Sequence, residues 1–363
     1  MPRSLPTAIV FALALTIPLR ADETVTSDPY WSLIHDQAVA GDLKLTAEQQ
    51  KAWRDALDPL DLRCFPLRNR SATEAELGLA KSAADARAQL TKILKPQQAQ
   101  RLDQIVVRSQ GPAALLRDDL AAKLKLTDKQ RADIRQAVTD ARQSRQKLEA
   151  DLRTAKLEIT PKLETAAAEK QLLKISEEER DAVNAILTND QKQRLAGLFA
   201  RDFDLSKLGR TAFKAPQLTA TTDSWVNAPP PSSNELTGRV LVVHFFAFGC
   251  SNCIHNYPTY REWQDKLAGK DVTFLGIHTP ETPGEHNVET LKTKLKSEKL
   301  TFPVLVDNGK ANWNAWGNSI WPSVYILDRR GYMRAFWPGE LRWQGATGDQ
   351  QMLQTINQLL AEK

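Results

Sequence analysis

Cys250 and Cys253 are separated by two residues, a spacing that supports either disulfide exchange or metal binding. The run 239–246 before them is apolar and rich in β-branched residues, and a helix-favouring segment follows through Leu267. We therefore expect a strand, a turn and a helix that opens at the first cysteine. At a helix N-terminus the dipole and the unpaired N–H groups stabilise a thiolate, which would make Cys250 a nucleophile. Cys253, one turn inward, could then resolve a mixed disulfide.

Zinc binding is the main alternative for such a pair. Structural zinc needs four ligands, commonly a second cysteine pair or a pair of histidines. The remaining cysteine is Cys64, and the five histidines form no spaced pair, so we expect no metal and no cofactor. A peroxiredoxin is disfavoured too, because that family requires threonine or serine three residues before its cysteine, where this chain has Ala247. Disulfide exchange is therefore the favoured chemistry.

The segments after the pair alternate between strand and helix patterns. Strands are predicted at 272–277, 302–307, 320–328 and 332–337, and helices at 288–299 and 350–361. This order is that of the thioredoxin fold, and from about Ala215 onward the chain resembles exported thioredoxin-like domains of the TlpA and DipZ type. The resemblance rests on Trp225-Val-Asn-Ala-Pro-Pro, the cysteine pair, Gly276–Glu281, Asp307–Trp316, Trp321-Pro322 and Pro258, which stands where thioredoxin helices carry a kinking proline.

The resemblance implies roles for two residues outside the cysteine motif. Pro322 is expected to be the cis-proline that faces the cysteine pair, and cis peptide bonds are nearly confined to proline. The backbone of Trp321, the residue before it, is expected to pair with the substrate peptide. The alternative for Trp321 is an aromatic residue that only packs at the surface.

The chain departs from the thioredoxin pattern in the strand before the motif. His244 lies six residues before Cys250, where thioredoxins usually carry a carboxylate that relays a proton to the buried thiol, and Phe246 replaces a tryptophan. A histidine titrates nearer neutrality and could do the same work. It could equally be a buried, hydrogen-bonded core residue. The predicted catalytic residues are thus Cys250, Cys253 and His244, with Trp321 and Pro322 as substrate-binding residues.

The first half of the chain is rich in good helix formers and contains an internal repeat. Leu43-Lys-Leu-Thr-Ala-Glu-Gln49 recurs as Leu124-Lys-Leu-Thr-Asp-Lys-Gln130, and 93–102 recurs as 186–195. Two copies of a helical hairpin unit are predicted, at roughly 41–110 and 122–203. The expected helix caps are Thr46, Thr127 and Thr188 with Gln49, Gln130 and Gln191 three residues on, and Pro96 in the remaining copy. The expected core residues are Trp53, Leu57, Leu60, Leu102, Ile105, Val106, Ile134, Val138, Leu195, Leu198 and Phe199.

The predicted fold class is therefore multidomain α + α/β, with an all-α helical repeat domain at 28–210 and a thioredoxin-like domain at 211–363. The Leu-Thr-x-x-Gln segments weakly resemble small exported helical proteins of the Spy and CpxP type. That resemblance implies a chaperone or stress-sensing role for the helical domain. The alternative is a domain for packing or for docking of a partner.

The N-terminus predicts export. Residues 1–21 combine a short basic start with an uncharged run at 7–19, which is too short to span a bilayer, since that takes roughly 20 apolar residues. A secretory signal cleaved after Ala21 fits, although Leu19 stands where a small residue is preferred, so an uncleaved anchor is the alternative. The formal net charge of +5 is small, and the lysines and arginines are interleaved with 44 acidic residues. This pattern disfavours nucleic acid as a partner.

The predicted function is an exported thiol–disulfide oxidoreductase of the periplasm or cell envelope, more a reductant than an oxidant. Its partners would be protein thiols and disulfides, with an unknown redox partner that could be membrane-bound. The alternative is an envelope-stress or chaperone-like binding protein that uses the helical repeats, with the thioredoxin domain as scaffold. Cys64 is either a third redox thiol or a half-buried residue without a partner.

Overall fold

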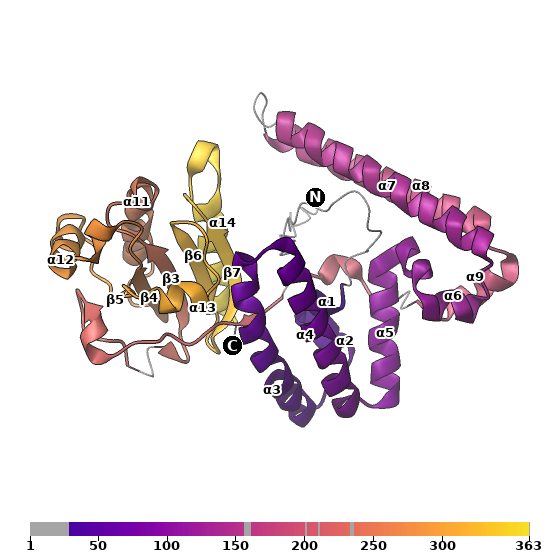
Figure 1. Ribbon diagram of the computed structural model, residues 1–363, viewed down its shortest axis with the longest axis horizontal. Helices are drawn as coiled ribbons and strands as arrows, with labels where there is room; N and C mark the ends of the chain where they lie inside the picture. Colours follow the sequence, from indigo (N-terminus) through magenta and orange to yellow (C-terminus); the bar gives the residue numbers. More distant parts are fainter. Residues whose placement is uncertain (1–28, 156–160, 200–201, 210, 233–235, 363) are drawn as a thin grey trace, which may run out of the picture.

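The computed structural model describes residues 29–155, 161–199, 202–209, 211–232 and 236–362. The predicted signal at 1–21 lies outside these residues. Within them, no helix combines the length and the apolar character needed to cross a bilayer. A helical first half is followed by a half built on a β-sheet, and the two lie side by side (Figure 1), so the predicted fold class is confirmed. A domain boundary between residues 210 and 211 stays a prediction.

The first half consists of helices that pack as hairpins. Two of its helices form a long two-helix arm that projects beyond the rest (Figure 1). The elements are α1 (Tyr30–Ile34), α2 (Gln37–Asp42), α3 (Ala47–Cys64), η1 (Phe65–Asn69), α4 (Ala72–Ile93), α5 (Pro96–Gln110), η2 (Gly111–Leu116), α6 (Asp118–Leu124), α7 (Asp128–Ala155), α8 (Pro161–Ile186), α9 (Asn189–Ala196) and η3 (Leu205–Lys207). The arm is α7 with α8.

The glutamines of the capping boxes also join two helix starts to each other. Thr46 accepts a hydrogen bond from the N–H of Gln49, and the pairs at 127 and 188 repeat this geometry. Gln49 Nε2 then donates to Gln98 Oε1 at 2.8 Å, which ties the start of α3 to that of α5. Gln130 Nε2 donates to Gln191 Oε1 at 2.8 Å and ties α7 to α9. The same bond thus occurs in both predicted units.

The predicted helical core divides into a buried and a half-buried set. The buried residues are Trp53, Leu57, Leu60, Leu102, Ile105, Val106 and Ile134. Val138, Leu195, Leu198 and Phe199 are only half-buried. Six residues of the first set pack in one core with residues of α1, α2 and α4, and Ile134 packs in a second core with Val183 of α8. Most of the second set lies along a cavity described below.

The second half is a seven-stranded sheet in the order β1-β7-β6-β3-β4-β5-β2. Its strands are β1 (Phe213–Lys214), β2 (Trp225–Val226), β3 (Val240–Phe246), β4 (Val272–His278), β5 (Val304–Val306), β6 (Ser323–Leu327) and β7 (Tyr332–Pro338). Its helices are α11 (Ser251–Lys266), α12 (Val288–Ser297), α13 (Ala311–Ala315) and α14 (Gly348–Ala361), with short turns η4 (Thr222–Ser224), η5 (Pro283–His286) and η6 (Trp343–Gly345). Strands β3, β4 and β5 are parallel and the other pairs antiparallel. The unpredicted β1, β2 and α13 are too short for a periodic pattern.

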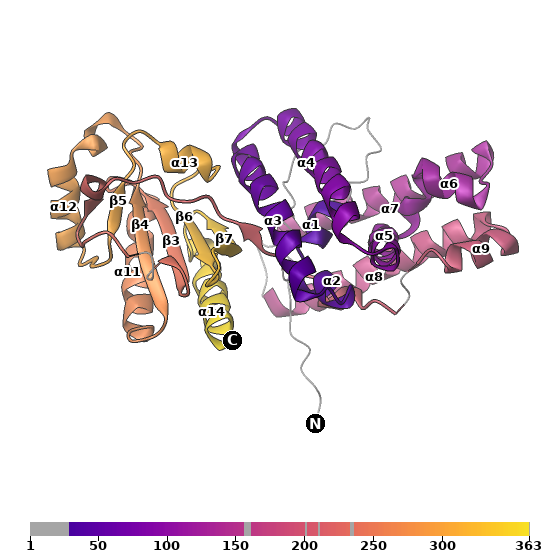
Figure 2. The same cartoon turned by 90° about the horizontal axis from the view of Figure 1, so that it is seen from below.

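Alternate residues of the central strand β3 face two different cores. Val242 and Phe246 pack with α11, α12 and α14, whereas Val243 and Phe245 pack on the opposite face with residues of and after α13. That second core also contains Phe65 from η1 of the helical half. Figure 2 shows α3 reaching the sheet beside α13 and β7.

Polar contacts also join the helical half to the sheet, in addition to the apolar contact of Phe65. The carboxylate of Asp61 on α3 accepts a 2.7 Å hydrogen bond from the N–H of Lys214 in β1 and lies 2.6 Å from Nε2 of His35. The hydroxyl of Tyr332 in β7 donates to Asp58 at 2.6 Å. The two halves are therefore joined through α3 and η1 rather than only by the linking chain.

Candidate active site

Cys250 and Cys253 lie at the start of α11, just after the turn that follows β3, as predicted. Cys250 is the N-cap residue of α11, and the N–H of Cys253 donates to its carbonyl oxygen at 3.1 Å. Both cysteines are free thiols. Cys250 is 9% exposed and Cys253 is 0% exposed, so a disulfide of another molecule reaches Cys250 first.

The pKa values of the two thiols are shifted in opposite directions. The hydrogen bond from the Cys253 thiol lowers the pKa of Cys250, and the backbone at Asn252 and Cys253 adds to this effect, as expected at a helix N-terminus. Burial raises the pKa of Cys253 far above the ordinary value of a thiol. Cys250 is therefore suited to attack as a thiolate, while Cys253 stays protonated until it is needed.

A carboxylate near both thiols was missed by the sequence analysis. The negative charge of Glu281 raises the pKa of Cys250 and of Cys253. Glu281 is exposed and lies on the loop after β4. Its position at the end of the Gly276–Glu281 motif was the available signal, but only the fold brings that loop to the cysteines.

Glu285 was missed as well, and it ties the cysteine turn to the same loop. Its carboxylate accepts hydrogen bonds from the N–H groups of Gly249 at 2.7 Å, Glu281 at 2.8 Å and Thr282 at 2.7 Å. Burial raises the pKa of Glu285, but these bonds outweigh burial and hold the pKa below its ordinary value. A Cβ atom at Gly249 would lie 2.8 Å from the carboxylate oxygen, so a larger residue there would displace the Glu285 side chain.

The Trp321–Pro322 peptide bond is cis, as the resemblance implies. The ring of Trp321 stacks on that of Trp313 with centroids 3.8 Å apart and planes at 20°. Its Nε1 donates to the backbone oxygen of Thr279 at 2.9 Å. The packing role considered for Trp321 is therefore present, and pairing of its backbone with substrate stays a prediction.

His244 is buried among aromatic rings on the α11 face of the sheet. Its ring centroid lies 4.3 Å from that of Tyr260 and 4.7 Å from that of Phe302. Neither ring nitrogen has a hydrogen-bond partner in the described part of the chain, so the expected hydrogen-bonded core histidine is not what the structure shows. Burial lowers the pKa of His244 to about 3, which keeps the ring neutral at physiological pH.

Large apolar residues lie next to the cysteine motif and next to Trp321 in the chain, and two of them are exposed. Ile254, next to Cys253, is 39% exposed, and Ile320, next to Trp321, is 44% exposed. Phe248 in the cysteine turn is half-buried. Exposed apolar side chains beside a reactive motif are suited to contact another protein.

Cys64 does not join this site. It lies in the helical half at the end of α3, half-buried and within hydrogen-bond contact of Ser82. Burial raises its pKa to about 11, so little thiolate forms at neutral pH. No group of three or more potential metal ligands occurs among the residues that the structure describes.

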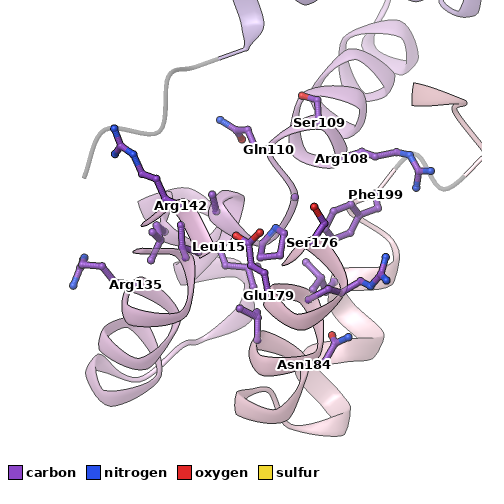
Figure 3. Close-up of a pocket in the computed structure, with 18 of the residues that line it drawn as sticks. Arg108, Ser109, Gln110, Leu115, Arg135, Arg142, Ser176, Glu179, Asn184 and Phe199 are labelled. Carbon is purple, nitrogen blue, oxygen red and sulfur yellow. The ribbon is translucent and has the colours of Figure 1, made fainter. Parts of the chain in front are cut away.

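A cavity of about 1110 Å³ lies in the helical half (Figure 3). It is bounded by α7, α8, α9 and η2. Val138, Leu195 and Phe199, three of the half-buried residues named above, belong to its apolar lining.

Comparisons with known proteins match part of the second half of the chain. Residues 212–336 match the AhpC/TSA family. Protein DipZ of Mycobacterium bovis is 29% identical over 150 residues, which is 40% of this chain and 20% of DipZ. The thiol-disulfide oxidoreductase YkuV of Bacillus subtilis is 24% identical over 147 residues, 40% of this chain and 94% of YkuV. A crystal structure of a thiol-disulfide isomerase from Corynebacterium glutamicum is 26% identical with a TM-score of 0.37, over 41% of this chain and 98% of that one.

The predicted resemblance to DipZ is confirmed by these matches. The chain spans only about a fifth of the length of DipZ, at 20% coverage. What DipZ does as a whole therefore does not carry over to this chain directly.

Proposed function

We propose that this chain, whose residues 212–336 form a thioredoxin-like domain of the AhpC/TSA family, exchanges disulfides of exported proteins through Cys250 and Cys253. The observation that carries the proposal is the contrast between the two thiols. Cys250 is partly exposed with a lowered pKa, and Cys253 is fully buried with a raised pKa. Ala247 still stands where a peroxiredoxin needs threonine or serine, so peroxide reduction is not proposed.

The reaction needs two exchange steps. The Cys250 thiolate attacks one sulfur of a substrate disulfide, the substrate S–S bond breaks, and one substrate thiolate leaves. Cys253 then loses its proton and attacks the sulfur of Cys250, which releases the second substrate thiolate and forms the Cys250–Cys253 disulfide. The substrate gains two electrons and the cysteine pair loses two. A partner dithiol must return two electrons to the pair before the next cycle.

The proton of Cys253 needs an acceptor. Glu281 is our first candidate, because its charge acts on both thiols from an exposed position. His244 is the candidate that the sequence offered, and its ring packs on Tyr260 of α11, the helix that carries Cys253. A ring whose pKa is about 3 is a weak base at neutral pH, so we rank it second.

The substrates we propose are polypeptides. Ile254, next to Cys253, and Ile320, next to Trp321, are exposed and offer apolar contacts. The backbone of Trp321 before cis-Pro322 is suited to pair with an extended chain. We further propose that the protein is exported to the periplasm or cell envelope, where such disulfides occur, and that it works as a reductant. The partner that reduces the pair could be membrane-bound.

Reduction of insulin disulfides by the full chain tests the proposal. We expect the wild type and Cys64→Ser to reduce insulin, and Cys250→Ser to be inactive. Equilibration with glutathione gives the reduction potential, and a potential near that of thioredoxin would support a reductant. An unreactive wild-type pair would overturn the oxidoreductase assignment, and a potential near that of DsbA would overturn the direction.

The cavity in the helical half supports a second candidate function, binding of polypeptide segments. Its lining holds six basic side chains, namely Arg108, Arg135, Arg142, Arg145, Arg180 and Lys192. Glu179 is the acidic residue named in the lining, and it is already paired with Arg145. Figure 3 shows Ser176 and Glu179 facing the cavity, with Arg135 and Arg142 at its rim. The lining of the cavity thus combines a strongly basic set of side chains with an apolar set.

Its shape favours an elongated occupant. Ser176, Arg180 and Asn184 line it at helical spacing on α8, and Leu172, which is 38% exposed, continues the same stripe by one turn. From Leu172 to Asn184 the stripe extends about 18 Å along the helix. A groove of this kind suits an amphipathic acidic segment laid between helices.

Fluorescence anisotropy with two synthetic amphipathic peptides tests this candidate. One peptide carries Glu and the other Lys at its polar positions, and both carry Leu on the apolar face. We expect binding of the acidic peptide that weakens with salt and is lost in Arg142→Glu/Arg180→Glu. The matched control is Lys174→Glu on the same helix, outside the lining. Equal binding of both peptides, or binding only to anionic vesicles, would exclude an acidic polypeptide as the occupant.

A further inference from the structure

The helical half contributes a residue to the core of the redox domain. Phe65 of η1 is buried, and its ring meets that of Trp316 edge-on with centroids 6.1 Å apart. Trp316 directly follows α13, and both rings belong to the core on the α13 face of the sheet. The turn at η1 is thus part of the packing of the thioredoxin-like domain.

The contact is close because Gly317 has no side chain. Its φ is +59°, and a Cβ atom there would lie 2.1 Å from the carbonyl oxygen of Phe65. Glycine adopts this backbone freely and allows the approach of η1. Any larger residue would displace η1 from the segment after α13.

Arg68 fastens the same turn by polar and ring contacts. Its Nη2 donates to the carbonyl oxygen of Trp316 and, at 3.0 Å, to the hydroxyl of Tyr325. Its guanidinium carbon lies 4.8 Å from the ring centroid of Phe336 and 5.4 Å from that of Tyr325. The Tyr325 hydroxyl donates in turn to Asn318 at 2.7 Å. Arg68 therefore holds the chain segment that leaves α13.

α13 connects this contact to the loop that contains Trp321 and cis-Pro322. Trp313, three residues before Trp316, stacks on Trp321 at 3.8 Å. The N–H of Trp313 donates to Asp307 at 2.9 Å, and Thr279 also donates to that carboxylate. Trp313 of this short helix thus contacts the cis-proline loop, and Trp316, the residue directly after the helix, contacts η1.

We propose that Phe65 and Arg68 are positioning residues for polypeptide substrates. Acting through Trp316 and Trp313, they hold Trp321 where its backbone, before Pro322, pairs with the substrate chain. This inference rests on the disulfide exchange proposed above. A small disulfide needs only to reach Cys250, so its reduction does not depend on η1.

The experiment compares a polypeptide disulfide with a small one on the full chain. For Arg68→Ala we expect KM for insulin to rise about tenfold, with kcat within about twofold, because a displaced binding element weakens positioning. The rate with 5,5′-dithiobis(2-nitrobenzoic acid) and the pH profile of Cys250 alkylation should stay unchanged. Gly317→Ala, which displaces η1 from the other side, should give the same split. Arg63→Ala is the control, because Arg63 lies at the same end of α3 but pairs with exposed Asp85.

Each outcome decides the matter. An unchanged KM for insulin in both Arg68→Ala and Gly317→Ala overturns the proposal. Equal losses with both disulfides together with a shifted alkylation midpoint show a merely structural role and also overturn it. A wild type that reduces neither disulfide contradicts the proposed function itself, and the positioning role falls with it.

Discussion

The carboxylate of Glu285 accepts a 2.7 Å hydrogen bond from the backbone N–H of Gly249, the residue before Cys250. It also accepts from the N–H groups of Glu281 and Thr282. One side chain therefore connects the turn that carries the nucleophile to the loop that carries the nearby acid. The relative position of Cys250 and Glu281 depends on this connection.

Glu285→Ala should destabilise the protein by about 1 kcal/mol, because it leaves three partly buried N–H groups without their acceptor. The pKa of Glu285 is lowered in the folded state, so its contribution is present above the ordinary carboxyl pKa of about 4.3 and is lost as the pH falls below it. Thermal unfolding at neutral and acidic pH measures this. The gap in Tm between the wild type and the variant should narrow towards acid. A gap that is constant with pH would contradict the assigned hydrogen bonds.

Alkylation of Cys250 should rise with pH around a midpoint below the ordinary thiol value of about 8.5. Glu281→Gln should move that midpoint further down, because the carboxylate raises the pKa of the thiol. Mass spectrometry of iodoacetamide-treated protein at several pH values measures both. Glu289→Gln is a control at an exposed residue of α12 that pairs with Lys292. If Glu281→Gln left the alkylation midpoint unchanged, Glu281 would no longer be a candidate to accept the proton of Cys253.

Cys253→Ser should trap the first intermediate. The variant keeps the nucleophile but lacks the resolving thiol, so incubation with a protein disulfide should accumulate a mixed disulfide at Cys250 that dithiothreitol releases. Non-reducing gel electrophoresis detects it. Cys250→Ser should form none, even though Cys64 is still present. Trapping at Cys64 instead would restore Cys64 as a redox thiol.

His244→Phe should retain insulin reduction within about threefold and raise stability by about 1 kcal/mol, because it removes buried ring nitrogens that have no hydrogen-bond partner among the described residues. The aromatic surroundings formed by Phe246, Tyr260 and Phe302 suit a phenyl ring. Chemical denaturation and the insulin assay measure the two effects. A tenfold loss of activity with accumulated mixed disulfide would instead identify His244 as the proton acceptor.

Local patterns in the sequence were enough for much of the redox domain. Alternation and apolar runs predict β3, β4, β6 and β7, and the start of α11 at the cysteines follows from the strand before it and the helical segment after it. The capping boxes at Thr46, Thr127 and Thr188 were predictable for the same reason, because their bonds join residues three apart. Each of these features depends on neighbours in the chain.

Other features depend on residues far apart in the chain, and only the tertiary structure decides them. The sequence places Glu281 and Glu285 in a loop without saying that the loop returns to Gly249. Burial decides that the His244 ring is neutral, and that Cys253 holds its proton more tightly than Cys250. The contact of Phe65 with Trp316 spans the two halves and leaves no periodic signal in either. The sequence thus determined the chemistry available at Cys250 and Cys253, while packing decided the charges, the positioning and the surface that act on them.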